Sequence, residues 1–218
     1  MSDELETHDV RCTATGTYRW VKRCIDWYIA LCALIITAPL FVLVAILIRR
    51  DGPGPIFFRQ TRAGRHARPF TLMKFRTMRI DVDPYGDSPQ NGADPRITSS
   101  GRFLRETSLD ELPQLLNVLR GDMSLVGPRP LYVQQIAEWN QRQRGRLLVT
   151  PGLTGLAQIH GRGSLTIEDK LEWDVRYVES ASLATDRSIL LRTVVGLFAR
   201  SDIYEVEYSR TRSRRSQE

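Results

Sequence analysis

The sequence predicts a mainly α-helical α/β protein: a re-entrant membrane helix hairpin followed by a compact cytoplasmic domain with amphipathic interfacial helices and a small sheet. Three observations predict this class. Residues 28–48 form an apolar run without a charge, residues 69–78 alternate apolar and polar side chains, and several later segments show helical periodicity. A chain of 218 residues provides one domain beside a membrane segment.

The apolar run has the length of a membrane helix. About 20 helical residues, at roughly 1.5 Å rise each, match a hydrocarbon core of about 30 Å. Pro39 removes a backbone hydrogen bond in the middle of the run and therefore predicts a kink. Basic residues of the kind found on cytoplasmic sides flank both ends, namely Arg19, Lys22, Arg23, Arg49 and Arg50.

These flanks predict a re-entrant helix over residues 18–50 that enters and leaves by the inner leaflet. Three aromatic residues are suited to anchor it at the interface: Trp20, Trp27 and Tyr28. A straight span is the alternative, because spanning helices tolerate proline kinks. Residues 1–17 are polar and predict a disordered leader, and residues 201–218 predict a basic tail.

Composition limits the partners and the chemistry. The formal net charge of +6 is compatible with an anionic membrane surface, phosphorylated substrates or nucleic acid. Three scattered cysteines predict neither a disulfide framework nor a zinc site. With three histidines, no Walker A pattern and no dinucleotide fingerprint, a histidine-centred triad or a nucleotide-binding motif of those kinds is not expected.

A basic segment without acidic residues runs from Arg59 to Arg79. Alternation over Pro69–Met78 predicts a half-buried strand with Lys74 and Arg76 on one face. Such a face suits phosphate binding, and a solvated basic strand beside acidic headgroups is the alternative. The following residues 81–95 are mostly turn formers and predict a mobile loop.

Asp110 and Glu111 are the strongest candidates for chemistry. Pro113 suits the first turn of a helix over Gln114–Arg120, so both carboxylates precede that helix. An ionised aspartate can attack phosphorus, and an adjacent carboxylate can hold a divalent ion. The structural alternative is a capping box, because Ser108 and Glu111 have the spacing at which glutamate merely satisfies a backbone N–H.

Arginines surround this acidic pair in the sequence. Arg105 lies upstream, and Arg129 lies downstream in the rigid turn Gly127–Pro130. Carboxylates at a helix N-terminus among arginines stay ionised near a site that favours phosphates.

The C-terminal half predicts three further helices. Val133–Arg146 reads as one amphipathic helix whose charges are solvated or face headgroups. Residues 166–178 form a helix in which Asp174 either reaches a metal or sugar hydroxyl or belongs to an exposed acidic face paired with Lys170 and Arg176. Residues 187–200 suit an interfacial or core-closing helix.

Four separated motifs, in order, resemble the bacterial sugar transferase family, the monotopic phosphoglycosyl transferases that start O-antigen, capsule and exopolysaccharide assembly. The resemblance covers residues 18–200 and implies that residues 51–200 form the catalytic domain. The motifs are KFRTM at 74–78, FLRETSLDELPQLLNVLRGDMSLVGPRP at 103–130, TPGLTGLAQIHGR at 150–162 and DVRYVE at 174–179.

This resemblance implies transfer of a sugar-1-phosphate from a UDP-sugar to undecaprenyl phosphate, with UMP released. By similarity, Asp110 is the nucleophile that carries a covalent phosphosugar, and Asp110 and Glu111 hold Mg²⁺. The remaining residues that the resemblance places at the substrate site are Lys74, Arg76, Arg105, Pro128, Arg129, Pro130, Gln158, Arg162 and Asp174.

The implied setting is the inner leaflet of the bacterial cytoplasmic membrane, with no nucleic-acid partner and with a homodimer left open. The family's helix breaks at a Ser-Pro pair, whereas this chain has Ala38-Pro39, so the degree of bend is open. Two other functions remain as alternatives: a basic membrane scaffold in which the acidic pair only caps a helix, and a Mg²⁺ phosphohydrolase that needs no lipid acceptor.

Overall fold

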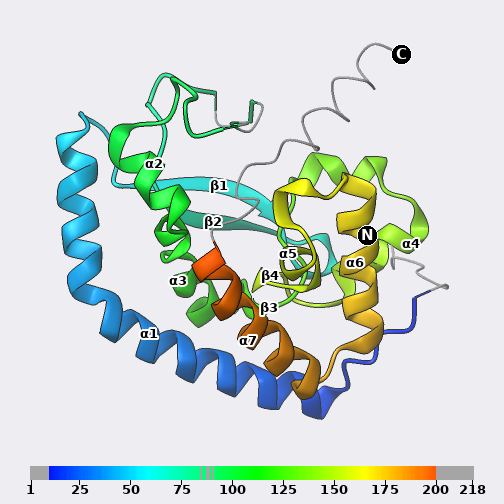
Figure 1. Cartoon of the computed structure of the whole chain (residues 1–218). Helices are drawn as coiled ribbons and strands as arrows, with labels where there is room; N and C mark the ends of the chain where they lie inside the picture. The colour runs from blue at the N-terminus through cyan, green and yellow to red at the C-terminus, as the bar shows by residue number, and fades with distance from the viewer. Residues whose placement is uncertain (1–9, 84, 87–88, 90, 200–218) are drawn as a thin grey trace, which may run out of the picture.

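The computed structural model describes residues 10–83, 85–86, 89 and 91–199 of the chain. Within these residues, helices dominate and the strands form two separate two-stranded sheets (Figure 1). The predicted mainly α class is therefore confirmed, and the chain forms two small sheets where one was predicted. The helices are α1 (Gly16–Arg50), α2 (Ser99–Glu106), α3 (Gln114–Arg120), α4 (Gln141–Arg144), α5 (Leu156–Ile159), α6 (Ile167–Ser180) and α7 (Leu183–Ala199). The strands are β1 (Phe57–Ala63), β2 (Pro69–Phe75), β3 (Ser124–Val126) and β4 (Gly152–Thr154).

Helix α1 is the longest element and the one long and apolar enough, among the described residues, to cross a membrane. It stays a single helix through Pro39 and does not divide into the two arms of a hairpin. Figure 1 shows it bending around the rest of the protein, below α3 and α7 and then up beside α2. The re-entrant path through a membrane therefore stays a prediction.

Both ends of α1 are fastened to the same body. Near its start, Arg23 donates to the carbonyls of Val118 and Leu119, the second at 2.8 Å, and so caps the end of α3. At its far end, the Oδ2 of Asp51 accepts from the Ser100 N–H at 3.0 Å. The middle of the helix exposes its apolar side chains, with Ile36 77% exposed.

The charges upstream of the apolar run are used inside the protein. Lys22 pairs with Asp186 of α7 at 2.9 Å, and Arg23 caps α3. Lys22 and Arg23 therefore also have structural partners in the folded domain, and the prediction that the basic flanks of the apolar run lie on the cytoplasmic side stays a prediction. The three predicted aromatic anchors do lie outside: Trp20 is 75%, Trp27 45% and Tyr28 66% exposed.

The predicted disordered leader is wrong for its described part. Val10 and Ala14 are 7% and 6% exposed and belong to the main core, and the Thr13 N–H donates to the carbonyl of Val178 in α6 at 3.2 Å. Packing against α6 thus holds residues 10–15, which carry no periodic pattern. Residues 1–9 and the predicted tail at 201–218 lie outside the described residues.

Strands β1 and β2 form an antiparallel hairpin that carries Lys74. The register pairs Phe58 with Lys74, and the predicted strand at residues 69–78 ends earlier, at Phe75. The side chain of Asn117, fully buried in α3, fixes this sheet: its Nδ2 donates to the Thr71 carbonyl at 2.7 Å and its Oδ1 accepts from the Met73 N–H at 3.1 Å. These two hydrogen bonds therefore fix the position of α3 relative to β2.

Strands β3 and β4 form a parallel pair that no sequence pattern predicts. Ser124 pairs with Gly152 and Val126 with Thr154. The glycines permit this close approach, because a Cβ on Gly127 would lie 2.5 Å from the Thr150 carbonyl oxygen. Three-residue strands are too short to produce a readable alternation.

The predicted single helix over Val133–Arg146 is wrong. The segment contains a 3₁₀ turn at Val133–Glu138, an extended Trp139 (φ −86°, ψ 136°), α4 and a second 3₁₀ turn at Gly145–Leu148. Trp139 is 5% exposed, and Asn140 starts the new helix by accepting from the Gln143 N–H at 2.9 Å. Burial of one large side chain thus breaks a pattern that reads as continuous.

Helices α6 and α7 confirm the last two predicted helices, with shifted ends. Thr166 caps α6 by accepting from the Asp169 N–H at 3.1 Å. On α7, Ile189 is 1% exposed and lies in the main core, whereas Val195 is 70% exposed. This helix therefore closes the core with one face and presents apolar side chains to the outside with the other.

Candidate active site

The acidic pair lies in a short 3₁₀ turn, Leu109–Glu111, between α2 and α3. Ser108 enters it in the left-handed region (φ 56°, ψ 15°). The flanking Leu109 and Leu112 pack against a buried cluster of Val44, Ile48, Phe75 and Leu104. These apolar anchors hold the turn against the end of α1 and β2, on the side where Lys74 lies.

Both oxygens of Glu111 are held by cations. Lys74 Nζ lies 2.8 Å from Oε1, and the Arg129 guanidinium lies 2.6 Å from Oε1 and 3.4 Å from Oε2. The Coulombic pull of Arg129 and Lys74 keeps the pKa of Glu111 well below its usual range despite burial. Since Ser108 makes no capping bond, the capping-box alternative is wrong.

Asp110 is buried and has spare hydrogen-bonding capacity. The residue is 7% exposed, its Oδ2 lies 3.9 Å from Lys74 Nζ, and no hydrogen bond to its carboxylate occurs within the described residues. Burial is the main cause that raises the pKa of Asp110, and the charge of Glu111 adds to it, while Lys74, Arg105 and Arg129 act in the opposite direction. The Asp110 carboxylate therefore lies near cations but accepts no hydrogen bond from them in the described residues.

The three cations around the acidic pair come from different elements. Lys74 is on β2, Arg105 on α2 and Arg129 in the turn after β3; we call them the cation cluster. Arg105 donates from Nε to Thr77 Oγ1 at 2.9 Å, which leaves the other end of its guanidinium for an anion. Predicted positions 74, 105 and 129 are thus brought together around Asp110 and Glu111.

Arg76 is placed elsewhere. It is 7% exposed and donates to the carbonyls of Ile48, Gly52 and Pro53 at 3.0, 3.0 and 2.7 Å. The predicted common face with Lys74 is wrong, because β2 ends at Phe75 and the two side chains take different partners. Arg76 ties down the carbonyls at the end of α1, a use that no local pattern signals.

The turn after β3 presents Arg129 between two buried prolines. The Gly127 N–H donates to the Thr154 carbonyl at 2.8 Å, and the Pro128 carbonyl accepts from the Gly152 N–H at 2.9 Å. Pro128 and Pro130 therefore fix the backbone of the turn, and Arg129 supplies the charge.

The other three predicted site residues differ in placement. Both polar atoms of the Gln158 side chain are buried without a partner in the described part of the chain, next to Gly155. Asp174 is 2% exposed and binds Arg146, so neither an open ligand position nor an exposed acidic face describes it. Arg162 begins a 3₁₀ turn, Arg162–Ser164, and its side chain lies outside what the structure describes.

Sequence reasoning missed Arg146 and Asn117. Arg146 was read as one of several solvated charges, yet it is 3% exposed. Asn117 was read only as part of a helical run, yet it joins α3 to β2. A polar residue on the apolar side of its helix was the available signal for Asn117; for Arg146 we find none.

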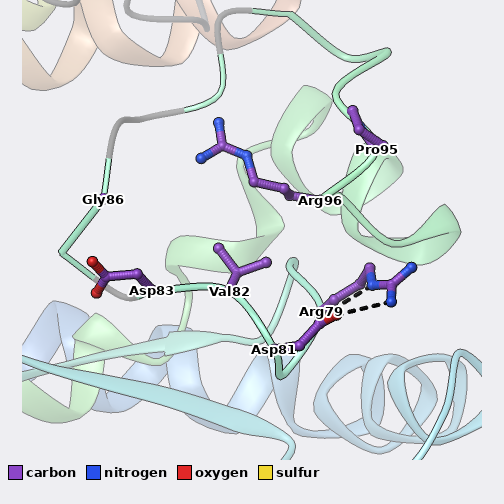
Figure 2. Close-up of a pocket in the computed structure, with 7 residues that line it drawn as sticks. All are labelled: Arg79, Asp81, Val82, Asp83, Gly86, Pro95 and Arg96. Carbon is purple, nitrogen blue, oxygen red and sulfur yellow. Dashed lines mark hydrogen bonds and ion pairs between the residues drawn. The ribbon is translucent and has the colours of Figure 1, made fainter.

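The structure also contains a surface hollow away from the acidic pair (Figure 2), lined by Arg79, Asp81, Val82, Asp83, Gly86, Pro95 and Arg96. Its charges are largely satisfied locally: Arg79 binds Asp81 at 2.9 Å, and Arg96 binds Asp94 at 2.7 Å. Both side chains of the first pair are more than half exposed. This hollow therefore lacks the buried carboxylate and convergent cations that distinguish the site at Asp110.

A comparison with known protein families identifies the class of protein. The chain matches the bacterial sugar transferase family over residues 17–200. The chain belongs to this family. That match includes every element that supplies a site residue, and it makes the protein an enzyme of the transferase class.

Among its relatives, the uncharacterized sugar transferase EpsL of Bacillus subtilis (strain 168) is 44% identical over 174 residues, 80% of this chain and 85% of that protein. The UDP-glucose:undecaprenyl-phosphate glucose-1-phosphate transferase of Caulobacter vibrioides is 43% identical over 195 residues, 84% of this chain and 72% of the relative. The transferase of the same name from Escherichia coli (strain K12) is 38% identical over 198 residues; the match covers 87% of this sugar transferase but 43% of that relative.

Proposed function

We propose that this sugar transferase moves a sugar-1-phosphate from a UDP-sugar to undecaprenyl phosphate through a phosphosugar bound to Asp110. The observation that carries the proposal is a buried carboxylate without a hydrogen bond in the described residues, facing a cation cluster of three side chains. The names of the relatives from Caulobacter vibrioides and Escherichia coli supply the donor and acceptor classes.

The chemistry proceeds in two displacements. A carboxylate oxygen of Asp110 attacks the sugar-linked phosphorus, the new bond joins that oxygen to phosphorus, and the bond to the UMP oxygen breaks with its electron pair. The terminal phosphate oxygen of the lipid then attacks the same phosphorus and releases the Asp110 carboxylate. Lys74, Arg105 and Arg129 offset the negative charge that would otherwise repel the nucleophile from a diphosphate.

Mg²⁺ fits this site by donor chemistry. Proteins hold this ion with one or two carboxylates and let substrate phosphates and water complete the shell. Asp110 accepts no hydrogen bond within the described residues, and Glu111 Oε2 has one contact there, with Arg129 at 3.4 Å, so both adjacent carboxylates keep lone pairs for the ion. When bound, the ion neutralises phosphate charge and assists departure of the nucleotide.

The function is tested with purified protein in bilayer nanodiscs, Mg²⁺ and a panel of UDP-sugars, with UMP release measured in the presence and absence of undecaprenyl phosphate. We expect at most one UMP per protein without the lipid and continuous release with it. Continuous release without lipid would indicate a phosphohydrolase. If the protein releases no UMP with any sugar, the scaffold alternative holds and the proposed transferase function is wrong.

The contacts of α1 support a re-entrant path. A helix of 35 residues is about 50 Å long, more than a bilayer core of about 30 Å. Both of its ends nevertheless bind the same folded domain, through Arg23 at one end and Asp51 at the other. A domain on one side of a membrane can hold both ends only if the helix returns to that side.

We predict that both ends of α1 face the cytoplasm. In a chain without its native cysteines, Thr17→Cys and Arg50→Cys place single thiols at the two exposed ends. A membrane-impermeant maleimide should label both in inside-out vesicles and neither in intact spheroplasts.

Ser180→Cys, exposed at the end of α6, is the matched marker for the folded domain. It should label in the same preparations as the two ends of α1. Labelling of Thr17→Cys and Arg50→Cys from opposite sides would establish a straight span and contradict the re-entrant path.

A further inference from the structure

A buried ion pair contacts the backbone of Arg129, a member of the cation cluster. Arg146 and Asp174 are 3% and 2% exposed, and Asp174 Oδ2 accepts from Arg146 Nε at 3.0 Å and from its terminal nitrogen at 2.7 Å. The guanidinium also lies 4.9 Å from the centre of the Trp139 ring. Three contacts therefore fix the position of this side chain inside the protein.

The same terminal nitrogen of Arg146 also donates to the backbone carbonyl of Arg129. The side chain of Arg129 in turn holds Glu111 at 2.6 Å. Four segments are thus joined in series: α6 through Asp174, the 3₁₀ turn at Gly145–Leu148 through Arg146, the turn after β3 through Arg129, and the turn before α3 through Glu111.

We infer that Arg146, fixed by Asp174, is a positioning residue that sets where the Arg129 guanidinium stands relative to Glu111 and Asp110. This rests on the proposed function of that site. Neither residue of the pair touches the reacting carboxylate; each acts through the backbone of Arg129. Asp174 therefore acts by fixing Arg146, and not through the predicted direct contact with substrate.

The chemistry of the pair favours positioning over simple stability. Taking two charges out of water carries a large desolvation cost, so a buried ion pair is weak evidence for stability on its own. An arginine can share one guanidinium between a carboxylate and a carbonyl because its donors form a rigid fork. Lysine keeps the charge but offers one compact group, so it cannot hold both partners in the same geometry.

A double-mutant cycle tests the inference. We expect Arg146→Lys to lower kcat/KM about 10- to 100-fold, by analogy with the range found for residues that orient metal ligands. In an Arg129→Ala background, the same change should cost less than about 3-fold, because the group that Arg146 positions is gone. Both measurements use full-length protein in nanodiscs, with thermal unfolding followed in parallel.

Arg142→Lys is the matched control. Arg142 also ties the α4 segment to α6, through Glu172 and Glu179, both at 3.0 Å, but its side chain is 39% exposed and contacts none of the described site residues. We expect this variant to keep kcat/KM within about 2-fold of the parent in both backgrounds.

Equal losses from Arg146→Lys with and without Arg129 would overturn the inference, as would unchanged activity. If Arg146→Lys does not fold, Asp174→Asn, which keeps the size of the side chain, takes its place in the same cycle with the same expectations. Failure of the proposed function is distinguishable, because it would appear as activity in an Asp110→Asn protein whatever the cycle gives.

Discussion

Asp110→Asn is expected to abolish sugar-phosphate transfer and to leave the protein at least as stable as the parent. Asparagine has nearly the same size but no anionic oxygen to attack phosphorus, so we expect kcat to fall by at least about 10⁴-fold, as for loss of a nucleophile. UMP release in nanodiscs measures the loss, and intact-protein mass spectrometry should show the phosphosugar adduct on the parent alone.

The stability expectation follows from the raised pKa of Asp110. The folded state then holds a proton on Asp110 more tightly than the unfolded chain does. Ionisation of this carboxylate therefore destabilises the fold increasingly as pH rises from the unfolded-state pKa to the higher folded-state pKa. At neutral pH asparagine removes the buried charge, and the melting temperature should stay or rise. A purely structural Asp110 predicts the opposite.

Asp122→Asn is the control for this prediction. Asp122 lies beyond the other end of α3, where one oxygen accepts from Asn117 at 3.2 Å. Its replacement also converts an aspartate to an asparagine near α3 but leaves the cation cluster intact. We expect near-parental kcat. Full turnover by Asp110→Asn, with no adduct on the parent, would disprove the nucleophile assignment.

Lys74→Met is expected to lower kcat/KM about 100-fold or more. It should also move the acidic limb of the profile of kcat/KM against pH to higher pH. Lys74 is the charge that most lowers the pKa of Asp110, so its removal lets burial raise that pKa further. Less of the aspartate is then ionised at a given pH, and the loss of one preorganised cation weakens stabilisation of the phosphate charge. Profiles of kcat/KM against pH measure both effects.

Lys74→Arg separates charge from shape. It keeps a cation near Asp110 and Glu111, so its acidic limb should lie closer to that of the parent than the limb of Lys74→Met does. If the Met variant shows the parental limb, Lys74 does not tune the nucleophile, and its contact with Glu111 at 2.8 Å is structural.

Features that depend only on neighbouring residues are readable from the sequence. The uninterrupted apolar run marks α1, the Gly121 stop and the proline before Gln114 mark α3, and Thr166 with the periodicity after it marks α6. Neighbouring residues also predict that Asp110 and Glu111 precede a helix. The arginines on either side of this pair in the sequence predict a site that favours phosphates. Propensity, capping and periodicity act over a few residues and are therefore readable.

The partner of each charged residue, by contrast, depends on how distant segments pack. Lys74, Glu111 and Arg129 converge from three elements, whereas Arg76 ties down the end of α1 and Arg146 joins Asp174 in the interior. An isolated arginine has the same local pattern in every one of these roles. Its partner depends on which distant segments pack together, because burial removes solvent and makes the nearest opposite charge or carbonyl the stable contact.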